Sequence, residues 1–207
     1  MITSREDAYK FLNNLWAEDA SAEEALRSAV HANTVWDIAY PINRLEGAEA
    51  VIEHFLRPLK AAFTALRRRD EIFIGGENVR DNGGEWVAAI THYVGNFNAP
   101  FYGVAPSGGL TFLRSGEFYR IEDGRIIEAK IILDMLDLMR QAGRFPLPRM
   151  LGTEMLFPGP ATHGGVLPKS RENGGRSLDL VQAMLADLRE FDPADFTSKG
   201  AAVEHAM

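Results

Sequence analysis

The sequence contains no cysteine, and this absence removes several kinds of chemistry. Disulfide bonds, cysteine-ligated zinc and thiol catalysis are all excluded. The five histidines show no close spacing of the kind that binds a metal ion, so we expect no metal site. Phosphate-binding loops, dinucleotide fingerprints and the Gly-x-Ser-x-Gly elbow are missing as well. We therefore expect no cofactor.

Long apolar runs and an excess of positive charge are also lacking. No run of about 18 apolar residues is present, so we expect no membrane-spanning helix. The first residues are amphipathic and acidic, unlike a secretory signal. A net charge of −7 argues against general binding to nucleic acid. These features predict a cytoplasmic protein whose partner is neither a membrane nor a nucleic acid.

The 207 residues are long enough for one sizeable domain followed by an extension. We expect an α+β domain over residues 1–145. Residues 146–175 are rich in Pro and Gly and cannot form a regular element. An amphipathic helix and tail are predicted over residues 176–207. The apolar face of this helix must be buried against its own domain, another subunit or a partner.

Helical periodicity occurs three times in the first third of the chain. The first two segments begin at serine N-caps, and the third predicted helix spans residues 47–66. Pro58 should kink that helix or divide it just before the proline. The basic run at residues 67–69 is then interpreted as the end of the helix, where cations are favoured.

Strand patterns dominate the middle of the chain. Asp123-Gly124 between two apolar runs is the strongest hairpin signal, because Gly tolerates the positive φ of a tight turn. A short helix over residues 134–143 closes the domain at a C-terminal glycine. Helices on one face of this sheet make an α+β domain, and strong curvature would make a cone with a hollow. Strands are predicted at residues 34–40, and as an antiparallel meander at 71–79, 85–97, 110–121 and 125–133.

Asp134 lies where the last strand pattern gives way to the helix pattern. It can serve as the N-cap of that helix. It can also serve as an acid/base group, which would need an apolar pocket to raise its pKa. Strand alternation puts Asp134 on the face of Lys130 and Ile132, opposite the uniformly apolar face of Ile131 and Leu133. Alternation does not settle which of these faces looks inward.

Other candidates have two readings each. His92, in an apolar strand, is either a hydrogen-bonded core residue or a proton shuttle. Arg114 and Lys130 could hold an anionic oxygen, or lie on a solvated sheet face. Glu117 and Tyr119 lie on the face opposite Arg114, at a dimer interface or in a pocket. Aromatic residues that form either plain core or the lining for a planar apolar ligand are Trp36, Tyr40, Phe55, Phe63, Phe101 and Tyr102.

Several stretches, in this order and spacing, resemble the SnoaL-like polyketide cyclases of the nuclear transport factor 2-like fold. The resemblance covers about residues 5–150. It implies a cone-shaped, curved antiparallel sheet with three N-terminal helices around a deep apolar pocket, and dimerisation through the sheet face. The matching stretches are Pro41 with LEG at 45–47, THYVGNF at 91–97, GEFYRI at 116–121, DGRI at 123–126, and DMLDLMRQAG at 134–143.

The resemblance also implies a function. Such cyclases close a ring by an intramolecular aldol reaction, and the position of their pocket carboxylate matches Asp134. The resemblance favours the Asp134 face as the inward one. We therefore expect a metal-free enzyme acting on an apolar carbonyl or ester compound, with Asp134 exchanging a proton, His92 assisting, and Arg114 or Lys130 steadying the oxyanion. The alternative is a non-catalytic ligand-binding or oligomerisation module of the same fold.

Overall fold

The computed structural model describes residues 1–2, 4–16, 21–78, 83–148 and 171–189. The chain divides into two compact units, Met1–Val166 and Leu167–Met207. Most of the predicted Pro/Gly-rich extension and the tail beyond residue 189 lie outside the described residues. Within the described part, no helix is long and apolar enough to cross a membrane.

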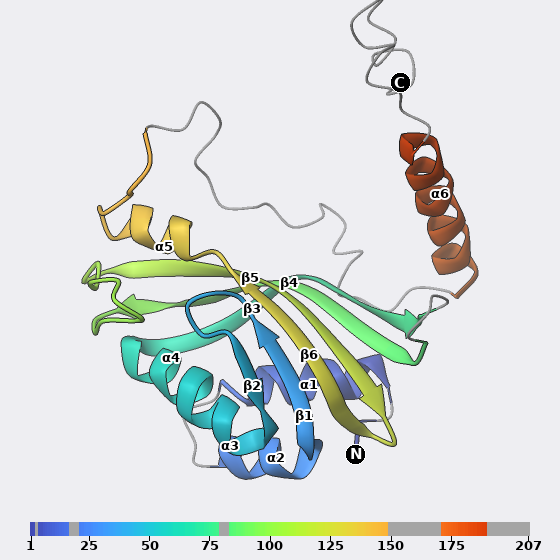
Figure 1. Ribbon diagram of the computed structural model, residues 1–207, viewed down its shortest axis with the longest axis horizontal. Helices are drawn as coiled ribbons and strands as arrows, with labels where there is room; N and C mark the ends of the chain where they lie inside the picture. The colour runs from blue at the N-terminus through green and yellow to red at the C-terminus, as the bar shows by residue number, and fades with distance from the viewer. Residues whose placement is uncertain (3, 17–20, 79–82, 149–170, 190–207) are drawn as a thin grey trace, which may run out of the picture. The chain divides into compact units, whose positions relative to one another are not determined.

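Six strands of the first unit form one mixed sheet in the order β2-β1-β6-β5-β4-β3 (Figure 1). The predicted antiparallel meander is confirmed as β3 to β6. β1 pairs in parallel with β6 and antiparallel with β2, and the sequence predicted neither pairing. The strands are β1 (Val30–Ile38), β2 (Arg44–Glu46), β3 (Phe63–Glu77), β4 (Glu85–Phe97), β5 (Leu110–Glu122) and β6 (Arg125–Leu133).

Helical segments precede β1 and β3. α1 (Arg5–Asn14) begins where the Ser4 side chain accepts a hydrogen bond from the Asp7 N–H, and α2 (Ser21–Ala29) follows. The third predicted helix is divided into α3 (Gly47–Val51), a π-helical turn η1 (Ile52–Leu56) and α4 (Arg57–Ala62). The interruption expected near Pro58 is confirmed, because the helix changes from the π-helical turn to α4 directly before this proline.

The interpretation of residues 67–69 as a helix end is wrong. α4 ends at Ala62, and β3 begins at Phe63. Ala65 has a positive φ of 53°, and the pairing with β4 shifts between Thr64 and Arg67. A bulge of this kind bends a strand and re-aims the side chains that follow. Arg68 is consequently buried in the sheet, with its neighbours in the sequence pointing to the other face.

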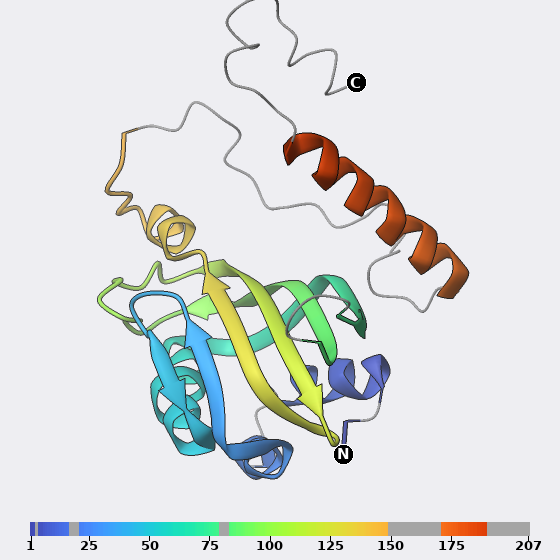
Figure 2. The same cartoon turned by 45° about the vertical axis from the view of Figure 1, so that its right-hand side comes forward.

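The two faces of the sheet differ sharply in what covers them. α1, α2, α3 and α4 lie on one face, here called the inner face, and α5 (Met135–Gln141) lies on the opposite, outer face (Figures 1 and 2). On β6 the buried side chains are Ile126, before the register shift with β5, and then Ala129, Ile131 and Leu133, whereas Ile132 is 62% exposed. The expectation that the Asp134 face looks inward is therefore wrong. The uniformly apolar face is the one that packs against the helices.

The second unit contains one described helix, α6 (Arg171–Arg189), which starts five residues before the predicted one. Three of its four leucines and its valine recur at spacings of three and four residues, as on one helix face. All of these side chains are exposed within the structure. They are Leu178, Val181, Leu185 and Leu188.

Candidate functional site

A small hollow lies against the inner face of the sheet, between it and the helices. Its volume is about 20 Å³, which is room for roughly one water molecule. The walls come from α1, α2, α3, η1, β1 and β5, and they are almost entirely apolar. The lining residues are Leu12, Leu15, Trp16, Leu26, Trp36, Val51, Phe55, Leu56 and Tyr119.

Strand register explains why the hollow forms at this point. Trp36 of β1 pairs with Ala129 of β6, and Ala129 pairs with Tyr119 of β5. Over the small Ala129 side chain the two large rings meet edge to face, with centroids 6.4 Å apart. Trp16 closes the hollow from the helix side, with its ring 5.6 Å from that of Phe55. Large side chains thus surround one small residue.

A buried carboxylate lies next to the hollow on the same face. Glu117 Oε1 accepts a hydrogen bond of 2.6 Å from the Tyr93 hydroxyl. Its Oε2 accepts one of 2.7 Å from the Tyr119 hydroxyl and one of 2.6 Å from Arg68 Nη1. The Glu117 residue has no exposed surface. Tyr119 therefore joins the lining of the hollow to a fully buried charge network.

Arg68 extends this network toward the helices. Its Nη2 lies 2.8 Å from Asp70 Oδ1, so one guanidinium faces two buried carboxylates. Asn13 of α1 donates a hydrogen bond of 2.9 Å to Asp70 Oδ2. The network thereby ties α1 to β3 and β5 across the inner face.

Burial and pairing fix the protonation states of this network. Burial opposes ionisation of Glu117, but Arg68 and the hydrogen bonds from the two tyrosines outweigh it and hold the pKa of the carboxyl below its usual value. Burial and the neighbouring Glu117 charge raise the pKa values of Tyr93 and Tyr119 well above the usual range. At neutral pH the network therefore holds a carboxylate, a guanidinium and two protonated tyrosines.

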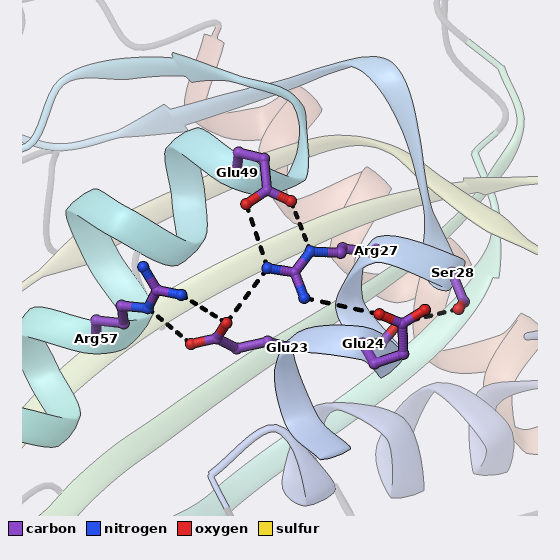
Figure 3. A network of polar contacts seen from close by, with 6 residues as sticks. All are labelled: Glu23, Glu24, Arg27, Ser28, Glu49 and Arg57. Carbon is purple, nitrogen blue, oxygen red and sulfur yellow. Dashed lines mark hydrogen bonds and ion pairs between the residues drawn. The ribbon is translucent and has the colours of Figure 1, made fainter. Parts of the chain in front are cut away.

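Two exposed arginine–glutamate pairs join α2 to α3 and α4 (Figure 3). Arg27 Nε of α2 lies 2.6 Å from Glu49 Oε1 of α3. Arg57 Nε of α4 lies 2.7 Å from Glu23 Oε1 of α2, and Arg27 Nη2 also reaches Glu23 at 3.3 Å. The pairs join α2 to the helix that supplies Phe55. Exposed ion pairs of this kind stabilise a fold only weakly.

The predicted catalytic residues meet on the other side of the sheet. His92 on β4 pairs with Arg114 on β5, and Arg114 Nη2 lies 3.1 Å from Asp134 Oδ2 at the end of β6. His92 is only 2% exposed, and its Nδ1 lies 3.6 Å from Glu71 Oε1. Burial lowers the pKa of His92, which favours the neutral imidazole. Asp134 also caps α5, since its Oδ1 accepts a 3.0 Å hydrogen bond from the Asp137 N–H.

The model of the SnoaL-like polyketide cyclase family matches residues 6–142 of this chain. The chain belongs to the SnoaL-like polyketide cyclase family. Among curated proteins, no sequence matches it.

Solved structures share the SnoaL-like fold at low sequence identity. A proposed SnoaL-like polyketide cyclase from Jannaschia sp. CCS1 has a TM-score of 0.53 at 21% identity, over 70% of this chain and 92% of the other. IdmH of Streptomyces antibioticus, described as a proposed polyketide cyclase, has a TM-score of 0.54 at 19% sequence identity, over 68% of this chain and 99% of IdmH. AclR of Streptomyces galilaeus, described as a proposed hydroxylase, has a TM-score of 0.52 at 18% sequence identity, over 69% of this chain and 100% of AclR. Such likeness shows the fold and leaves the reaction open.

The sheet of this SnoaL-like chain separates the residues predicted to work together. Trp36 and Phe55 line the hollow. Phe63 and Phe101 are buried elsewhere in the core, while Tyr40 is 82% exposed. The remaining predicted residues do not line the hollow. Tyr102 is partly exposed and His92 is buried. The others lie on the outer face and are Arg114, Lys130 and Asp134.

Sequence reasoning missed much of the buried network. Alternation places Glu117 and Tyr119 on one strand face but does not decide between a dimer interface and a pocket. Arg68 was not predicted as a core residue because residues 67–69 were interpreted as a helix end. Tyr93 lies in an apolar strand pattern that gives no sign of a polar partner. Among the described residues, no group of three acidic or histidine side chains could hold a metal ion.

Proposed function

We propose that this chain binds an apolar small molecule bearing a carbonyl or ester group in the hollow of the inner face. The observation that supports this most is a buried charge network placed against an almost wholly apolar void. Burying such a network costs stability relative to an apolar core, and apolar packing would serve better if structure were its only role. In this proposal the hollow is the interior of the cone that the resemblance to the family implies.

Binding requires the wall of the hollow to move. A void of about 20 Å³ admits one polar atom and not a ring system. α2 supplies Leu26 to the lining and is fastened to α3 and α4 through exposed ion pairs. In the proposal these pairs break and α2 moves outward as the ligand binds. The carbonyl end of the ligand then lies in the hollow beside Tyr119.

Overpacking beside the hollow should weaken binding. Ala129→Leu places a larger side chain against the lining residues Trp36 and Tyr119, its neighbours on β1 and β5, and overpacking costs about 1–3 kcal/mol of stability. We expect saturable binding of 1-tetralone, a compact aromatic ketone, to the natural chain by isothermal titration calorimetry. Ala129→Leu should weaken this binding at least tenfold. Ala88→Leu, on the outer face of β4, is the control and should bind as the natural chain does.

Unchanged binding in Ala129→Leu would place the ligand elsewhere. An absence of binding by the natural chain, in calorimetry and in thermal unfolding, would contradict the proposed function itself.

We propose acid/base chemistry by Asp134, assisted by His92, as a second candidate function. It is favoured by the row in which His92, Arg114 and Asp134 lie side by side. Under this proposal Asp134→Asn lowers turnover of an enolisable substrate about 10²–10⁴-fold. Under the first proposal the same variant leaves binding in the hollow unchanged. Asn caps a helix as well as Asp, so the free energy of unfolding should change by less than about 1 kcal/mol in either case.

The predicted homodimer remains a proposal. It is supported by large apolar side chains on the outer face, where Ile74 is 54%, Phe118 45% and Ile132 62% exposed. Exposed apolar groups clustered on one sheet face are typical of an interaction surface.

A further inference from the structure

Trp36, one of the residues that line the hollow, has an indole N–H without a hydrogen-bond partner among the described residues. Its Nε1 is shielded from water and makes no hydrogen bond to any residue that the structure describes. The whole residue is 3% exposed. Buried N–H groups in native proteins are nearly always paired, because an unpaired one loses its hydration without compensation. Because Trp36 also lines the hollow, an acceptor bound there would supply the partner that this buried N–H lacks.

Tyr119 is the obvious alternative donor, but its proton is already committed. A tyrosine hydroxyl has one hydrogen to donate. The Tyr119 hydroxyl donates to Glu117 Oε2 at 2.7 Å, and the same carboxylate also receives Arg68 and Tyr93. An ionised carboxylate has no proton of its own and only accepts, so the Tyr119 proton must remain in this hydrogen bond. Tyr119 therefore presents lone pairs to the hollow and not a donor.

Size and position agree with a single oxygen atom at this point. The void holds about one water-sized group, and Trp36 faces Tyr119 across Ala129. A carbonyl oxygen at the end of an otherwise apolar ligand has this size and accepts from an N–H donor. A hydrocarbon of the same shape would leave the indole N–H unpaired.

Resting on the proposed function, we infer that Trp36 is the specificity-determining residue of the hollow. Its indole N–H donates to the carbonyl oxygen of the ligand, while Tyr119 and Glu117 hold the opposite wall in place. The chain should then select apolar ketones or esters over hydrocarbons of equal size through Trp36.

Two probes of the same shape test this inference, 1-tetralone and its hydrocarbon counterpart tetralin. The natural chain should bind the ketone about tenfold more tightly, which corresponds to one hydrogen bond. Trp36→Phe keeps an aromatic ring but lacks the N–H, so it should bind both probes with equal Kd and retain its affinity for tetralin within about threefold. Trp86→Phe is the control, because the Trp86 indole donates to the Gly83 carbonyl and does not line the hollow. It should keep the tenfold preference.

The failures of the two proposals have different signatures. A ketone preference that persists in Trp36→Phe would overturn the role of Trp36 while leaving the hollow as the binding site. Equal binding of both probes by the natural chain would overturn it too, and would indicate that a bound water already pairs the indole. If neither probe binds the natural chain, the proposed function fails, and the inference that rests on it fails as well.

Discussion

Replacing Glu117 by Gln should lower the free energy of unfolding by about 3 kcal/mol, among the largest effects of any single change in this chain. Glu117 has no exposed surface and compensates the charge of Arg68 at 2.6 Å. Removing one partner of a buried pair costs about 3–5 kcal/mol, because the other charge stays buried. Asp70 remains beside Arg68, so the lower end of that range applies.

The same variant should change how stability depends on pH. The pKa of Glu117 is lower in the folded chain than the ordinary value of 4.5, so its contribution is fully present above that value. The contribution is lost as the pH falls through the folded-state pKa. The difference between the natural chain and Glu117→Gln should therefore shrink below about pH 4.5.

Urea unfolding at pH 7 and under acidic conditions measures both effects. Glu122→Gln, at the exposed end of the same strand, is the matched control and should change stability by less than about 0.5 kcal/mol. Equal, small losses in the two variants would show that the buried network contributes nothing to the fold.

Phe55→Ala should destabilise the chain by about 3–5 kcal/mol and at the same time make it a better receptor for apolar ligands. Phe55 is 4% exposed, lines the hollow and packs edge-on against Trp16 and Tyr93. Removing its ring enlarges a void that is at present the size of one water. Apolar cavities of this origin stay dry and accept small aromatic molecules.

Thermal and urea unfolding with and without 1-tetralone test this prediction. Ligand at about 100 times Kd should restore about 2.7 kcal/mol to Phe55→Ala. Phe63→Ala is the matched control, since Phe63 is 2% exposed and stacks on Phe97 outside the hollow. It should lose similar stability and gain no more from the ligand than the natural chain does. Equal rescue of the two variants would mean that the ligand fills any cavity, with no preference for the hollow.

Local signals made most of the fold predictable. Asp123 and Gly124 both have positive φ, as the hairpin between β5 and β6 requires, and the meander around them follows from short-range pairing. The parallel pairing of β1 with β6 joins residues almost a hundred positions apart, and no local pattern encodes it. The third helix was predicted four residues too long, because the bulge at Ala65 depends on pairing with β4.

The site was predictable only in part, for a related reason. The cap role of Asp134 could be predicted, because an N-cap depends on a few neighbouring residues. The inward face of β6 could not, because alternation separates two faces without saying which one the helices cover. The hollow depends on Trp36, Ala129 and Tyr119 being adjacent across three strands, and only the sheet order brings them together.

The most direct test of this account is a crystal structure of the chain with 1-tetralone. We predict electron density for the ligand on the inner face, next to Trp36 and Tyr119, with α2 displaced from α3 and the Arg27–Glu49 pair broken. Density on the outer face beside Asp134 and His92, with the inner hollow still closed, would contradict the account.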